Sequence, residues 1–81
     1  MANNDLLIFS ARGSQNITVS GRLDQTAQFQ LFDMHGRLVK SSHLEAQRPQ
    51  QTVATHDLQH GAYVVVISNQ HRQQTQKIII H

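Results

Sequence analysis

Short runs of strand-forming residues, each closed by turn-forming residues after about ten positions, restrict the fold of this chain more than any other feature. This spacing is typical of a β-sandwich or barrel, and no segment carries the longer period of an amphipathic helix. The predicted strands are residues 6–10, 16–20, 27–33, 37–42, 51–55, 62–68 and 74–80. We therefore expect an all-β fold, an immunoglobulin-like antiparallel β-sandwich of about seven strands.

Two of the predicted strands indicate how the sandwich is layered. Residues 27–31 (AQFQL) alternate apolar and amide side chains, so one face of this strand should meet the core and the other water. Residues 62–67 (AYVVVI) are apolar on both faces, which favours a central strand around which the core forms. Residues 43–50, which contain the only proline, are predicted to be a loop. The glutamines spread along the chain are expected to cover the solvated faces of the sheets.

A tight hairpin is predicted between the third and fourth strands, at residues 33–36 (DMHG). The carboxylate of Asp33 can accept hydrogen bonds from the backbone that follows it, and Gly36 can take a positive φ at little steric cost. The third and fourth strands should therefore be direct neighbours in one sheet.

The size and composition of the chain exclude several classes of function. Its 81 residues fit one domain, predicted as residues 6–81 after an added start or linker at residues 1–5, and leave little room for a deep catalytic pocket. Cysteine is absent, which excludes disulfides, thiolate nucleophiles and Cys-based zinc sites. The Lys and Arg residues are scattered and the net charge is +2, so no nucleic-acid-binding patch is predicted. No apolar run approaches the ~20 residues that span a bilayer, and the N-terminus lacks the pattern of a signal peptide.

No catalytic, metal or cofactor site is predicted. The six histidines include no His-x-His pair and are interpreted as surface residues. No serine lies in a Gly-x-Ser-x-Gly motif, and the five carboxylates are dispersed. Asp33 and Asp57 each precede a turn, where binding to loop backbone is the usual role. The chain is therefore expected not to be an enzyme and to need no cofactor.

Residues 58–65 (LQHGAYVV) are the most informative segment. Leu58 can plug one end of a sandwich, and Gly61 allows the chain to turn sharply. Tyr63 would then enter a strand with its ring buried and its hydroxyl free to bond the backbone upstream. This arrangement is the tyrosine corner of Greek-key sandwiches, and by itself it predicts only a folding role.

Three segments, in this order, carry a resemblance to a known family. Residues 29–39 (FQLFDMHGRLV) contain Asp33 and Gly36, and residues 58–65 contain Leu58, Gly61 and Tyr63. Residues 75–80 (TQKIII) supply a lysine and an aliphatic run, Lys77, Ile78, Ile79 and Ile80. Together they resemble the C-terminal sorting domains of the type IX, or Por, secretion system of Bacteroidetes, over roughly residues 6–81.

The resemblance implies a sorting signal: the domain would direct attached cargo from the periplasm across the outer membrane to the cell surface. The implied partners are an outer-membrane translocon and a sortase-like cysteine peptidase, which removes such domains before the cargo is attached to anionic lipopolysaccharide. The residues that the resemblance marks for recognition or structure are Asp33, Gly36, Leu58, Gly61, Tyr63, Lys77, Ile78, Ile79 and Ile80.

One departure from the family leaves alternatives open. Many members open with an aromatic-Pro-Asn-Pro segment, whereas residues 8–14 here read IFSARGS. One alternative is a non-cleaved domain of a surface-retained component of the attachment machinery, which would interact with anionic lipopolysaccharide or partner proteins. Another is a generic immunoglobulin-like adhesion or sugar-binding module. A homodimer through an edge strand is a further candidate association, and no nucleic-acid partner is expected.

Overall fold

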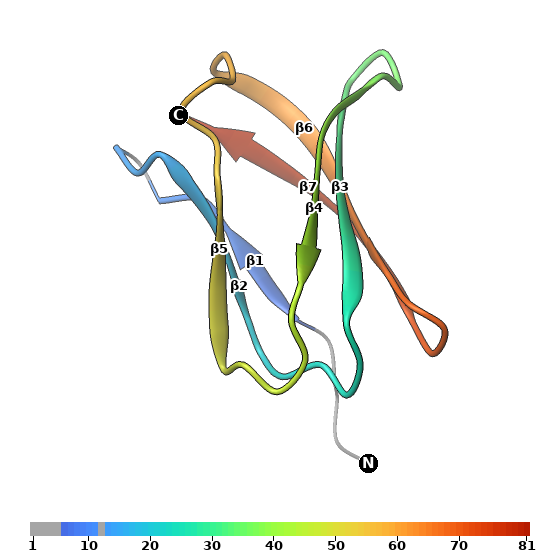
Figure 1. Cartoon of the computed structure of the whole chain (residues 1–81). Coiled ribbons are helices and arrows are strands. Elements are labelled where there is room, and N and C mark those ends of the chain that lie inside the picture. Colours follow the sequence, from blue (N-terminus) through green and yellow to red (C-terminus); the bar gives the residue numbers. More distant parts are fainter. Residues whose placement is uncertain (1–5, 12) are drawn as a thin grey trace.

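The computed structural model describes residues 6–11 and 13–81, which fold into two antiparallel sheets packed face to face (Figure 1). Residues 1–5, expected to be an added start or linker, and Arg12 lie outside the described residues. The strands are β1 (Leu7–Phe9), β2 (Asn16–Ser20), β3 (Ala27–Asp33), β4 (Leu38–Leu44), β5 (Gln50–Ala54), β6 (Gly61–Ser68) and β7 (Gln73–Ile80). The predicted all-β sandwich is therefore confirmed.

The main corrections to the predicted strands fall around the loop in the middle of the chain. The fourth strand extends to Leu44 rather than ending at residue 42, because β4 stays paired with β3 until Ala27 lies opposite Leu44. The fifth strand is one residue earlier than expected, so buried Thr55 lies just after it. The predicted loop at residues 43–50 is thus shortened to residues 45–49.

The two sheets have the strand orders β1-β2-β5 and β4-β3-β6-β7. In the constant-type immunoglobulin arrangement the fourth strand joins the sheet of the first two strands. Here β4 pairs with β3 because the hairpin between them is too short to let the chain cross to the other sheet. The chain makes that crossing over residues 45–49, and β5 then pairs with β2.

The core lies between the sheets and takes every second residue of the strands, as the period of two requires. Strands β3 and β6 contribute Phe29, Leu31, Val65 and Ile67, all with no exposed surface. Burying an aliphatic or aromatic side chain of this size contributes about 1.5–3 kcal/mol, so a few such residues carry much of the stability of a small domain. The predicted central strand is confirmed, since β6 lies between β3 and β7, and β3 shares the centre of the core with it.

Glutamine side chains bridge the two open seams between the sheets, which corrects the expectation that the glutamines only cover solvated faces. At one seam the carboxamide of Gln74 in β7 donates to the Leu6 carbonyl (2.8 Å) and accepts from the Leu6 amide (2.9 Å). Gln76 donates to the Ile8 carbonyl at 2.8 Å. At the other seam Gln51 in β5 makes the same pair of bonds to the backbone of Glu45, at 2.9 and 3.0 Å.

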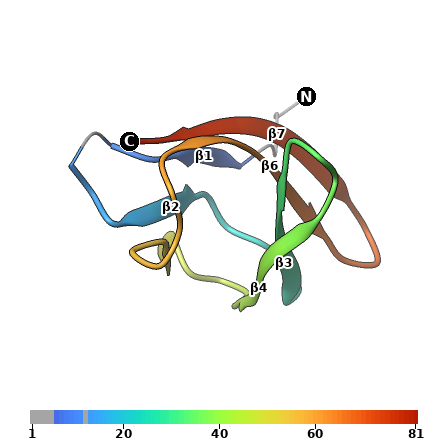
Figure 2. The same cartoon turned by 90° about the horizontal axis from the view of Figure 1, so that it is seen from above.

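The bonds to Leu6 and Ile8 all join residues 68 positions apart, so β1 runs parallel to β7 (Figure 2). An edge strand exposes backbone groups that can pair with another chain. The carboxamides of Gln74 and Gln76 bond such backbone groups on Leu6 and on Ile8 of β1, and these bonds also hold the two sheets together.

Candidate recognition site

The hairpin between β3 and β4 is organised by the carboxylate of Asp33. Its Oδ1 accepts hydrogen bonds from the backbone amides of His35 (2.9 Å) and Arg37 (3.0 Å), and its Oδ2 accepts from Arg37 Nε at 2.9 Å. The amide of Gly36 donates to the Asp33 carbonyl at 3.1 Å, and Gly36 has a φ of 86°. The predicted turn, with an aspartate that binds loop backbone and a glycine at positive φ, is confirmed.

Hydrogen bonding to the charged form lowers the pKa of Asp33, first through the Arg37 backbone amide and then through the His35 amide and the Arg37 side chain. The pKa of Asp57 is also lowered, and the main cause is its hydrogen bond with Lys40 Nζ at 3.0 Å. The expectation that Asp57 binds loop backbone as Asp33 does is thus incomplete, because its carboxylate mainly ties the β5–β6 loop to β4.

The segment before β6 forms the expected tyrosine corner. The Tyr63 hydroxyl donates to the Gln59 carbonyl at 2.7 Å, and the side chain is 8% exposed. Leu58 is partly buried and packs against the core, and its amide donates to the Thr55 carbonyl at 3.0 Å. Gly61 has a φ of 154° and begins β6. These bonds close the end of the sandwich, as the sequence predicts.

The last strand, β7, lies at the edge of the four-stranded sheet and alternates between core and solvent. Ile78 and Ile80 are buried, whereas Ile79 is 44% exposed and Lys77 points to the solvent side. The aliphatic run therefore has two separate roles that the sequence pattern alone did not distinguish. Two of its residues complete the core, and one is available to another molecule.

The strand register brings the three motif segments into one place. Asp33 lies opposite Tyr63 in the β3–β6 pair, and Tyr63 lies opposite Ile78 in the β6–β7 pair. Segments distant in the sequence thus form neighbouring positions at one end of the four-stranded sheet. An open groove of about 470 Å³ lies beside them, and its lining includes Met34, Val39 and Leu58.

Sequence reasoning did not identify the bridging glutamines as structural residues. Gln74 and Gln76 carry the same side chain as Gln28, which is exposed on the outer face of β3. The alternation of β7 places Gln74 and Gln76 on the inner side, with Ile78 and Ile80, and this was the one available signal.

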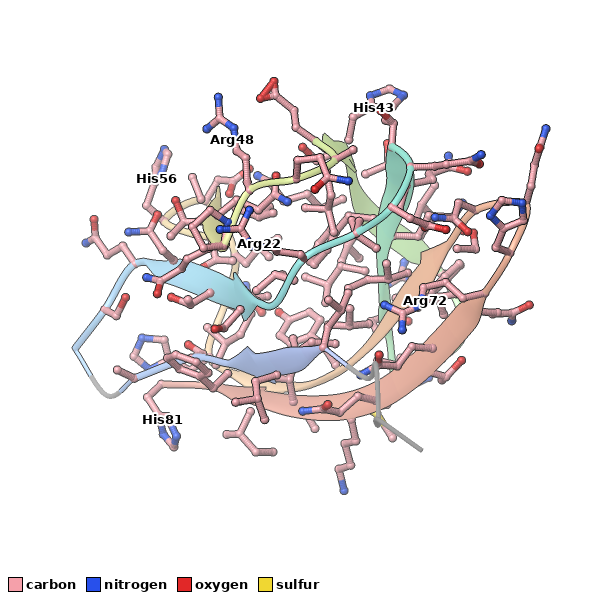
Figure 3. All side chains as sticks on the ribbon, turned by 90° about the horizontal axis from the view of Figure 1, so that it is seen from below. Arg22, His43, Arg48, His56, Arg72 and His81 are labelled. Carbon is pink, nitrogen blue, oxygen red and sulfur yellow. The ribbon has the colours of Figure 1, made fainter. Side chains whose placement is uncertain are left out.

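The histidines are spread over the surface, as predicted, and all six are exposed. His43, His56 and His81 lie at different places around the molecule in Figure 3. Across residues 6–11 and 13–81, no group of three or more His, Cys, Asp and Glu side chains has a geometry that could hold a metal ion. Within those same ranges, no helix has the length and apolar character needed to cross a membrane.

Comparison with known proteins gives one informative result. A family model described as a secretion system C-terminal sorting domain matches residues 11–81. This range includes the hairpin, the tyrosine corner and β7. A search of curated proteins finds no match.

Proposed function

This chain belongs to the family of secretion system C-terminal sorting domains, those of the Por or type IX system, and we propose that β7 is the part of the domain that the outer-membrane translocon recognises. The family is a non-catalytic sorting signal. The domain accordingly acts through binding, and its cargo is a secreted protein.

The observation that carries the proposal is the position of β7 at the edge of its sheet, with its last residues beyond the glutamine bridges. The bridges to β1 start from Gln74 and Gln76, so the part of β7 from Lys77 onward carries none of them. An edge strand of this kind can accept a further strand, which gains affinity from backbone hydrogen bonds and specificity from alternate side chains. Lys77 and Ile79 are the side chains of this segment that face solvent.

In the proposed export route, recognition of β7 comes between arrival of the cargo in the periplasm and its passage across the outer membrane. The cargo reaches the periplasm, the translocon pairs with β7, and the cargo crosses the outer membrane to the cell surface. A sortase-like cysteine peptidase then separates the domain from the cargo, which is joined to anionic lipopolysaccharide. The motif residues of the hairpin and the corner support this function through the fold. Asp33 and Gly36 form the β3–β4 turn, and Leu58, Gly61 and Tyr63 close the end of the sandwich at which β6 begins.

A fusion of the domain to a periplasmic reporter tests the proposal in a host with a working type IX system. The intact fusion is expected to bring the reporter to the cell surface or the medium, and deletion of residues 77–81 is expected to leave it in the periplasm. Because the deletion also removes buried Ile78 and Ile80, Lys77→Ala provides the sharper variant. It should keep the circular dichroism spectrum and lower export, whereas Gln73→Ala, at an exposed position of the same strand, should export normally.

The same fusion separates removal of the domain from retention. A shortened reporter joined to lipopolysaccharide indicates cleavage. An uncut fusion held at the surface favours the surface-retained component, for which the absence of the Pro-Asn-Pro segment at residues 8–14 is the supporting observation. If the intact domain leaves the reporter in the periplasm while another family member exports it from the same strain, the proposal is wrong.

A further inference from the structure

The outer face of the four-stranded sheet, the face turned away from the core, is divided into a polar end and an apolar end. The strand register sets its side chains in rows across the strands. The rows nearest the β6–β7 turn consist of His43, Gln28, Ser68 and Gln73, and of Ser41, Gln30, Val66 and Thr75.

At the other end of this face the rows are apolar. One row consists of Leu38, Phe32, Val64 and Lys77, and the next holds Ala62 and Ile79. Leu38 is 51% exposed and Ile79 44% exposed, while Phe32 and Val64 are half-buried. No second layer of the described chain covers this surface, because the three-stranded sheet lies on the opposite side (Figure 2). We call the five apolar residues with Lys77 the apolar face.

Lys77 is the single charged residue in these rows, and no acidic residue belongs to them. Among the described residues, Lys77 takes part in no ion pair. A cation set within an apolar surface favours a partner that brings a carboxylate, since burying the ammonium group without one is costly.

We propose that the apolar face is a docking surface for a protein partner that presents an acidic side chain surrounded by apolar residues. The inference rests on the proposed function, in which that protein belongs to the translocon. The apolar face thus adds a second contact to the one at the β7 edge. One strand of the partner would pair along β7, and the partner's surface beside that strand would cover Val64, Phe32 and Leu38.

Two other occupants fit the apolar face less well. A second copy of this chain would bring a second Lys77 into the contact and no carboxylate from either face, so the two ammonium groups would repel each other. A membrane surface attracts proteins through clusters of basic residues, each worth about 1 kcal/mol, and this face offers one.

The apolar face lies at the opposite end of the sheet from Leu6, the first residue that the structure describes. Leu6 is bonded to Gln74, which belongs to the same part of β7 as the polar rows. The apolar rows lie toward the opposite end, beside the β3–β4 hairpin (Figure 1).

The decisive variant is Leu38→Gln, because Leu38 lies on β4, at the opposite edge of the sheet from β7. Binding of the 81-residue chain would be measured to liposomes that carry the outer-membrane proteins of a host with a working type IX system, and to protein-free liposomes of the same lipids. The wild-type chain should bind only the first. Leu38→Gln should weaken that binding about fivefold, because the complex would no longer bury the half of the leucine side chain that is exposed in the free domain. Leu7→Gln, which makes the same change at an exposed leucine on β1 of the three-stranded sheet, is the matched control and should bind as wild type.

Charge variants test the second part of the inference. Lys77→Glu should weaken binding more than tenfold and Lys77→Arg should retain it, because the latter keeps the positive charge. Val64→Thr, on β6 and directly opposite Lys77, serves as a second apolar variant and should also weaken binding. Circular dichroism and thermal unfolding show that each variant is folded.

The outcomes distinguish this inference from the proposed function. If the wild-type domain exports its reporter and folded Leu38→Gln binds and exports equally well, the apolar face is not used and the sorting function stands. Equal binding to protein-free liposomes would identify a lipid surface and overturn the inference. A dimer in sedimentation that Leu38→Gln dissociates would identify a second copy and overturn it too. If the wild-type domain neither binds nor exports, the proposed function is wrong, and the inference that rests on it is overturned as well.

Discussion

Removing the side chain of Tyr63 should destabilise the domain by about 3 kcal/mol. Its ring is 8% exposed, and it lies in one row with Asp33 and Ile78, so truncation to alanine leaves a cavity that those neighbours cannot fill without moving. Aromatic-to-alanine substitutions in cores cost about 3–5 kcal/mol, and the lower value suits a residue at the end of the sandwich.

The hydroxyl of Tyr63 can be separated from the ring. Tyr63→Phe removes the 2.7 Å hydrogen bond to the Gln59 carbonyl and keeps the packing. A net contribution of about 1 kcal/mol is usual for such a bond, and exposure of Gln59 lets water replace part of it. Tyr63→Phe should therefore cost at most about 1 kcal/mol, roughly a third of the alanine effect.

Urea unfolding followed by far-ultraviolet circular dichroism is the suitable assay, because Tyr63 is the only tyrosine and there is no tryptophan to report in its place. Gln59→Ala is the matched control: it removes an exposed side chain but leaves the carbonyl that Tyr63 binds, so it should not change stability. A loss below about 0.5 kcal/mol for Tyr63→Ala would refute the corner as a source of stability.

Two further predictions concern the turns and the seam. Gly36→Val and Gly61→Val should each lower the free energy of unfolding by about 1–3 kcal/mol, because both glycines have positive φ and a β-branched residue resists it, although a new Cβ would meet open space. A urea unfolding midpoint equal to that of the wild type would contradict this prediction. Gln74→Ala should destabilise the domain by about 1–2 kcal/mol, because two hydrogen bonds to the backbone of Leu6 are lost, and it should speed hydrogen exchange at the Leu6 amide. Gln73→Ala, on the exposed side of β7, should do neither. Equal exchange in both variants would show that the bridge does not protect the Leu6 amide.

The strands, the hairpin and the corner could be predicted because their causes are local. Alternation places Phe29 and Leu31 on one side of β3 whatever lies opposite. Asp33 and Gly36 set the turn through bonds that span at most four residues. The bond from Tyr63 to Gln59 spans four as well. A short connection then leaves β4 no neighbour other than β3.

The sequence could predict which residues belong to the recognition site, but only the tertiary structure shows how they are arranged. Lys77, Ile78, Ile79 and Ile80 stand together in the sequence, but the β6–β7 register decides that Ile78 meets Tyr63 in the core while Lys77 lies beside Val64 on the outer face. The apolar face exists because four strands bring Leu38, Phe32, Val64 and Lys77 into one row.

The sequence by itself determined which residues turn inward where alternation is clear, as in β3, where the chain turns and to which family it is similar. Period, turn chemistry and motif spacing all act over a few residues. Only the tertiary structure decided what each inward or outward residue meets. Gln74 bonds the backbone of Leu6, 68 positions away in the chain, and the residues near either one do not indicate that the two are partners. Such pairs arise when two sheets close over one core, since closure brings their edge strands together and leaves backbone groups that must find partners.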